Sequence, residues 1–123
     1  MYNMFIHLTQ RTIAKEGGKR VDPQKISLMF KALSDETRVK IILELMKGEQ
    51  CACHLLKNLH LTQPVLSHHM QILCASGLVE SQRAGRWMHF ALNMHGVAEA
   101  QTITQRLFKV TEKDPFSSMS CCP

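Results

Sequence analysis

Five cysteines stand out in this chain of 123 residues, and four of them occur as two close pairs. Cys51 and Cys53 are two positions apart, Cys121 is followed directly by Cys122, and Cys74 stands alone. Thiolates are soft ligands that select soft, thiophilic ions. Such close pairs are not the spread pattern of a disulfide framework. We therefore predict a thiol site for a soft ion, with Cys51, Cys53, Cys121 and Cys122 as candidate metal ligands.

The start of the chain lacks the long apolar run of a signal peptide, and no segment reaches the roughly 18 apolar residues of a membrane helix. We therefore expect a cytoplasmic protein without a membrane partner, in a reducing compartment where thiols bind metals or carry out redox chemistry. The formal net charge of +5 and the pI of about 9.1 favour a polyanionic partner such as nucleic acid. A thiol redox switch, which needs the same exposed thiols, stays open at this point.

The elements that position these thiols are predicted from the periodicity of the apolar residues. Helices are expected from Pro23 to Leu33, from about 35 to 47, from about 51 to 59, from about 63 to 76, and over about 94–110. Segments 78–83 and 86–92 alternate like two strands around a turn at Ala84-Gly85. The fold class is thus mainly α with a small β-hairpin, and two short helices followed by a hairpin predict a winged helix-turn-helix.

This pattern divides the chain into three parts. An N-terminal arm covers 1–20, a DNA-binding and dimerisation domain covers 21–110, and a flexible Cys-containing tail covers 111–123. The first and last helices of the domain carry more apolar surface than one small core needs, which predicts a homodimer; the alternative is that they only cover the core of their own chain. The side chains expected on the buried faces of the two central helices are Val39, Ile42, Leu43, Met46, Leu66, Met70 and Leu73.

The helix after Thr62 carries small polar side chains opposite its apolar face, as a recognition helix does. We predict base contacts from this face and phosphate or minor-groove contacts from the hairpin turn. A dimer would place two such helices about 34 Å apart on double-stranded DNA, so the operator should be an imperfect palindrome. The candidate DNA-binding residues are Thr62, Gln63, Ser67, His68, Gln71, Arg83 and Arg86.

Several consecutive motifs resemble the ArsR/SmtB family of regulators. The run from Phe30 to Arg38 is similar to the "ALSDPTR" opening of that family, and Glu49 to Leu55 is similar to its "ELCVCDL" metal box. Leu61 to Leu73 resembles the recognition-helix pattern of the family, and Ser76 to Val79 and Gly85 to Phe90 resemble its wing. The resemblance covers about 26–92 and implies a homodimeric repressor that leaves its operator when it binds a metal or metalloid.

The resemblance also implies a choice of ion. The arsenite-responsive branch carries Cys-x-Cys-x-x-Cys, whereas this chain has Leu56 at the third position. We expect trivalent arsenic or antimony as the effector, with Cys121 or Cys122 as the best candidates for the third thiolate; a partner subunit could also provide it. An organoarsenical or a soft divalent ion (cadmium, lead or zinc) stays open. The zinc-responsive branch uses acids and histidines on its last helix, where this chain has His95 and Glu99.

Positions i and i+2 of a regular helix point about 200° apart, so we expect ion binding by Cys51 and Cys53 to unwind the helix start. An enzyme is not expected, because the chain has no Cys-x-x-Cys, no phosphate-binding glycine loop and no acid/base pair around the cysteines. No cofactor is therefore required. A DNA-binding protein without a ligand and a metal carrier without DNA are the remaining alternatives.

Overall fold

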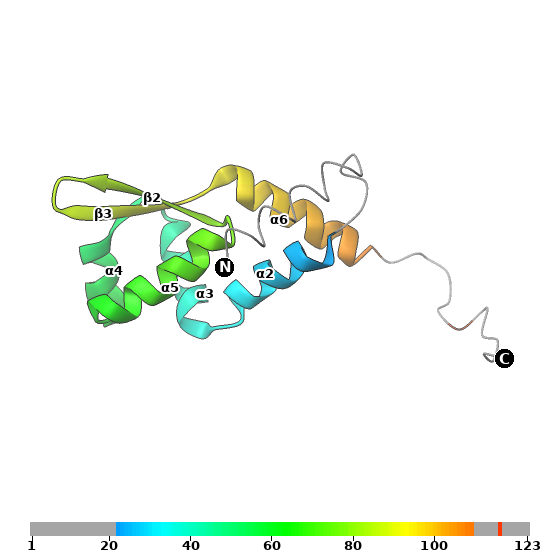
Figure 1. The fold of residues 1–123 in the computed structure, drawn as a ribbon, viewed down its shortest axis with the longest axis horizontal. Coiled ribbons are helices and arrows are strands. Elements are labelled where there is room, and N and C mark those ends of the chain that lie inside the picture. The colour runs from blue at the N-terminus through cyan, green and yellow to red at the C-terminus, as the bar shows by residue number, and fades with distance from the viewer. Residues whose placement is uncertain (1–21, 110–115, 117–123) are drawn as a thin grey trace.

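The computed structural model describes residues 22–109 and residue 116 (Figure 1). The arm and nearly all of the tail, including Cys121 and Cys122, lie outside the described residues. The elements, in chain order, are α2 (Pro23–Leu33), α3 (Glu36–Leu45), β1 (Gln50–Cys51), α4 (Ala52–Leu59), α5 (Gln63–Ala75), β2 (Val79–Ala84), β3 (Trp87–Leu92) and α6 (Met94–Leu107). This order confirms the predicted winged helix-turn-helix, mainly α with a small sheet.

Capping residues decide where the first helices begin. The carboxylate of Asp22 accepts a hydrogen bond from the amide of Gln24, and Pro23 occupies the first turn of α2. The carboxylate of Asp35 accepts one from the amide of Arg38 at the start of α3. These bonds satisfy amides that have no partner within the helix.

The core lies between the helices and the inner face of the sheet. Leu66, Met70 and Leu73 of α5 are buried, as predicted. The predicted face of α3 is wrong in most positions: Val39 is 38% exposed, Leu43 54% and Met46 66%, and only Ile42 packs partly against the core. The buried residues of this helix are Ile41 and Leu45. Because apolar residues fill adjacent positions on this helix, periodicity allows two faces that differ by one step of about 100°. Packing of α3 against α2, α4, α5 and β3 selects the face of Ile41.

The sheet has three strands in the order β1-β3-β2, not the two of the predicted hairpin. The added strand β1 pairs antiparallel with β3, so that Cys51 lies opposite His89. The turn of the hairpin is shifted by one residue to Gly85-Arg86, because Ala84 pairs with Trp87 and Gly85 adopts a left-handed φ of +63°. The sequence did not predict β1, because its two residues are too few to show the period-2 pattern of a strand.

The hairpin β2–β3 and the helix pair α2 and α6 occupy opposite ends of the molecule (Figure 1). Lys25 of α2 and Glu99 of α6 form an ion pair across these two helices. The amide of Asn93 donates to the carbonyl oxygen of Leu78 at 2.9 Å, which ties the start of α6 to the start of the hairpin. No helix in 22–109 is long and apolar enough to cross a membrane.

Candidate nucleic-acid interface and thiol site

Helix α5 presents one polar face to solvent. Its N-cap is Thr62, as predicted, although the hydroxyl of Thr62 makes no capping hydrogen bond to the part of the chain described. Burial of Leu66, Met70 and Leu73 turns the opposite side of the helix outward. All five predicted residues of this helix and its cap are exposed: Thr62, Gln63, Ser67, His68 and Gln71.

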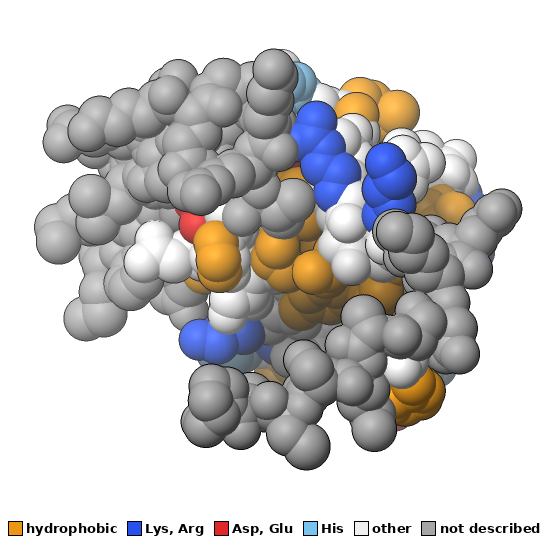
Figure 2. Space-filling model, turned by 90° about the vertical axis from the view of Figure 1, so that its right-hand side faces the viewer, with side chains coloured by type: hydrophobic (Ala, Val, Ile, Leu, Met, Phe, Trp, Pro, Cys, Tyr) orange, Lys and Arg blue, Asp and Glu red, His pale blue; other side chains and the backbone are white. Residues whose placement is uncertain are grey.

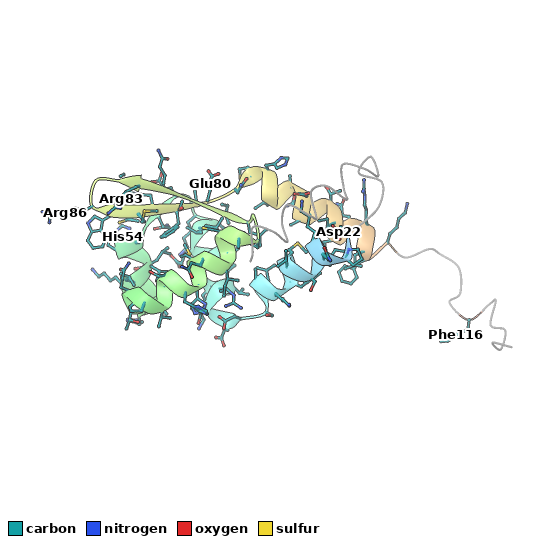
Figure 3. All side chains as sticks on the ribbon, in the orientation of Figure 1. Asp22, His54, Glu80, Arg83, Arg86 and Phe116 are labelled. Atoms are coloured by element: carbon teal, nitrogen blue, oxygen red, sulfur yellow. The ribbon has the colours of Figure 1, made fainter. Side chains whose placement is uncertain are left out.

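The hairpin adds two cations to the same region. Arg83 and Arg86 are exposed, and Figure 3 shows both in the part of the hairpin farthest from α2 and α6. A cavity of about 300 Å³ lies between α5 and the hairpin, and Gln63, Ser67, Arg83 and Arg86 are among its lining residues. The structure thus brings predicted residues of two elements to one concave surface.

Trp87 also lines this cavity, and it was not among the predicted site residues. It is 47% exposed at the first position of β3, directly after the turn. A large aromatic ring beside two arginines at a hairpin turn is the signal that could have indicated it. Its exposed ring adds an apolar surface next to the two arginines that line the same cavity.

The thiols of Cys51 and Cys53 meet at the start of α4. The Sγ atom of Cys53 donates to the Sγ atom of Cys51 at a distance of 2.6 Å. This hydrogen bond lowers the pKa of Cys51 below its ordinary value, and the same bond raises the pKa of Cys53. Cys51 is therefore the more acidic thiol of the pair, and the thiolate is the form that binds a soft ion.

The expected unwinding of the helix start is not needed to bring these thiols together. Cys51 is the N-cap of α4, with an extended backbone (φ −69°, ψ 145°), and not its first helical residue. The separation of about 200° holds only when both positions are helical. Pairing of Cys51 with His89 keeps Cys51 in strand β1 and frees its side chain to turn toward Cys53.

The structure does not assemble a complete ligand set. Within 22–109 and residue 116, no group of three His, Cys, Asp or Glu side chains is arranged to hold a metal ion. Cys74 is half-buried, and burial raises the pKa of its thiol, which suits a structural residue. Glu99, half of the alternative site on the last helix, is paired with Lys25.

A polar helix face, an adjoining cationic hairpin and a core of packed helices define a winged helix-turn-helix regulator that binds DNA, and not an enzyme. Residues 35–81 match the family described as "Bacterial regulatory protein, arsR family". The chain is 37% identical over 86 residues to the arsenical resistance operon repressor of Escherichia coli K12, covering 69% of this chain and 74% of that protein. The chain belongs to the ArsR family of transcriptional repressors.

Two further proteins to which the chain is similar are also described as transcriptional regulators. The cadmium resistance transcriptional regulatory protein CadC homolog of Staphylococcus aureus is 31% identical over 90 residues, covering 72% of this chain and 74% of that protein. The solved structure of an ArsR-like transcriptional regulator from Rhodococcus sp. RHA1 is 31% identical with a TM-score of 0.60, covering 68% of this chain and 76% of that chain.

Proposed function

We propose that this protein represses transcription from an operator and leaves it when trivalent arsenic or antimony binds to its thiols. The observation that carries the proposal is the convergence of the Cys51 and Cys53 sulfur atoms, 2.6 Å apart, at the start of the helix that precedes α5. Two thiolates on one side of a helix start suit a thiophilic ion. Cys121 or Cys122 supplies the third thiolate that such an ion prefers.

Double-stranded DNA binds to the surface formed by α5 and the hairpin. Gln63, Ser67 and Gln71 read base edges in the major groove, together with Thr62 and His68. Arg83 and Arg86 contact phosphates, so each should contribute about 0.9 to the slope of log affinity against log salt. The positive formal charge of +5 supports an electrostatic contribution of this kind.

The repressor acts as a homodimer through α2 and α6. Figure 2, which views the molecule from the end where α2 and α6 lie, shows hydrophobic side chains gathered between lysine and arginine side chains. Phe30 of α2, Leu107 of α6 and the adjacent Phe108 are exposed large apolar residues. A second copy would cover them, and its two-fold symmetry would match an imperfect palindrome.

The thiols and the DNA surface are connected through Ala52. This residue follows Cys51 directly, is buried, and lines the cavity between α5 and the hairpin together with Leu66 and Phe90. An ion that draws the Cys51 and Cys53 sulfurs into its own geometry displaces the backbone at Ala52. Such a displacement disturbs the contact of α5 with the hairpin and lowers the affinity for DNA.

A soft divalent ion such as cadmium, lead or zinc is the second candidate effector. It is favoured by Leu56, which takes the place of a third cysteine, and by the likeness to a cadmium resistance regulator. Divalent ions of this class accept sulfur together with nitrogen or oxygen ligands, so two thiolates suffice for part of their site.

The test is fluorescence anisotropy of labelled palindromic DNA from the region upstream of the protein's own gene. Reduced protein is added first, followed by arsenite, antimonite, cadmium or zinc in separate titrations. Release by arsenite or antimonite supports the proposal, release by the divalent ions alone supports the second candidate, and binding with no release overturns both.

Cysteine variants localise the response. Cys51→Ser and Cys53→Ser should bind the operator and not be released, whereas Cys74→Ser is the matched control and should respond like the unchanged protein. A doubly substituted Cys121→Ser, Cys122→Ser protein should respond at higher arsenite concentrations. A normal response of Cys51→Ser or Cys53→Ser would exclude this pair as the sensor.

A further inference from the structure

His89 lies directly opposite Cys51 in the pairing of β3 with β1. Residues that face each other across antiparallel strands project from the same side of the sheet, with Cβ atoms about 4.5–5.5 Å apart. Phe90, the next residue of β3, is buried in the core, so His89 projects from the outer face. Its side chain is 30% exposed. His89 is therefore a cross-strand neighbour of Cys51, and its imidazole is reached by solvent.

Glu49 holds this imidazole by one of its two nitrogens. The Nδ1 atom of His89 lies 2.7 Å from Oε1 of Glu49. When Nδ1 donates to a carboxylate, the tautomer is set and Nε2 carries the lone pair that can bind a metal ion. A histidine whose second nitrogen donates to a carboxylate is the usual arrangement of a metal-binding histidine in proteins.

We propose that His89, oriented by Glu49, is a third ligand of the Cys51–Cys53 pair for a borderline-soft divalent cation of the zinc and cadmium class. The Cys51–Cys53 pair and the His89–Glu49 pair are separate in the structure. Binding of one ion by all three ligands therefore requires a change of the His89 side-chain rotamer toward Cys51. The cross-strand spacing permits it, and the side chain of Glu49, 63% exposed, is free to follow. Two thiolates and one imidazole leave a fourth position of a tetrahedral site open to water or an anion.

This ligand set differs from the all-sulfur set of the proposed arsenite response. An imidazole suits zinc-class ions and is a poor substitute for a thiolate toward trivalent arsenic. The inference rests on the proposed thiol site, and it names a third ligand with which a divalent ion of the second candidate class would bind there without the tail cysteines. The ion would also join the start of α4 to the middle of β3, the strand that begins at Trp87 beside the hairpin turn, so it would act on the DNA-binding hairpin directly.

The experiment uses Co²⁺ as the probe, with the full-length reduced protein carrying Cys121→Ser and Cys122→Ser. Absorption bands from thiolate to Co²⁺ count the thiolates, and the ligand-field bands report tetrahedral geometry. We expect two thiolates bound in this background. His89→Gln should weaken Co²⁺ binding by at least about tenfold and change the ligand-field bands, and Glu49→Gln should weaken it by roughly 10-fold to 100-fold. His60→Asn, at the exposed C-cap of α4, is the control and should change neither, because asparagine tolerates the left-handed backbone there.

His89→Cys is the complementary variant. It should raise the thiolate band in proportion to a third thiolate and should increase the affinity for arsenite in the same background. The inference would be overturned if His89→Gln had the same Co²⁺ spectrum and affinity as the protein with His89, and if His89→Cys added no thiolate to the site. That result would leave the proposed thiol pair unaffected. Absence of any thiolate band, together with arsenite release that is insensitive to Cys51→Ser, would instead overturn the proposed function.

Discussion

The guanidinium of Arg38 and the imidazole of His69 meet 3.2 Å apart, between the start of α3 and the middle of α5. The same guanidinium donates from Nε to the carbonyl oxygen of Ala32 at 2.7 Å and from a terminal nitrogen to that of Lys31 at 3.2 Å. Both carbonyls belong to the last turn of α2, and that of Lys31 also accepts from the amide and the hydroxyl of Ser34. One side chain therefore joins the proposed dimerisation helix α2, α3 and the proposed recognition helix α5.

Replacement of Arg38 should lower the stability of the fold, because the guanidinium contacts the carbonyls of Ala32 and Lys31 and the imidazole of His69. We expect Arg38→Ala to lower the free energy of unfolding by about 1–3 kcal/mol. Arg38→Lys keeps the charge and loses the fork of donors, so it should recover only part of that loss. Urea denaturation followed by circular dichroism measures both. Lys57→Ala, at an exposed position of α4, is the control and should change stability by less than about 0.5 kcal/mol. If Lys57→Ala lowered the stability as much as Arg38→Ala, the contacts of Arg38 would have no special role.

His69 should make stability depend on pH. Burial, with the charge of Arg38 as a further cause, lowers the pKa of His69 below its ordinary value near 6.5, against an opposing effect of Asp35. The unfolded chain then binds more protons than the folded one between the folded pKa and about 6.5. Stability from this residue is thus present above about pH 6.5 and is lost as the pH falls toward the folded pKa.

His69→Asn tests this dependence, since its side-chain oxygen can accept from Arg38 in place of Nδ1. Its free energy of unfolding should fall less steeply than that of the unchanged protein between about pH 7 and pH 5. His95→Asn serves as the control at an exposed site and should retain the original slope. Parallel pH profiles for His69→Asn and the unchanged protein would contradict the prediction.

Gly96 is required where α6 crosses the start of the hairpin. A Cβ atom at this position would collide with the carbonyl oxygen of Gly77, which is backbone and has no rotamer to change. We expect Gly96→Ala to cost about 1–3 kcal/mol of stability, although alanine favours a helix. Thermal unfolding measures the loss. Gln101→Ala, exposed on the same helix, should be nearly neutral, and an equally stable Gly96→Ala would mean that α6 does not pack this closely.

Cys51 should be the most reactive of the three described cysteines. The hydrogen bond from Cys53 lowers the pKa of Cys51, whereas the pKa values of Cys53 and Cys74 are raised. Near neutral pH, limiting iodoacetamide should therefore modify Cys51 first, because the thiolate is the nucleophile. Peptide mapping by mass spectrometry measures the order. Cys53→Ala should slow the reaction of Cys51, and earlier modification of Cys74 would contradict the assignment.

Much of the fold was predictable because its signals are local. Asp22-Pro23 marks the start of α2, and the spacing of Leu66, Met70 and Leu73 identifies the inner face of α5. The polar residues of α5 are exposed, as that spacing requires, and the arginines that flank the hairpin turn are exposed as well. The inner face of α3 was not predictable, because Ile41, Ile42 and Leu43 are similarly apolar and only the neighbouring helices distinguish them.

The sequence by itself determined the kinds of element, the cysteine pair and the family motifs, since caps, turns and periodicity arise among residues close together in the chain. The tertiary structure decided what depends on distant segments. The pairing of Cys51 with His89 placed Cys51 outside α4 and turned its thiol toward Cys53. The same pairing placed His89 opposite Cys51 across the strands, because strand register depends on the packing of the whole sheet and not on two residues of β1.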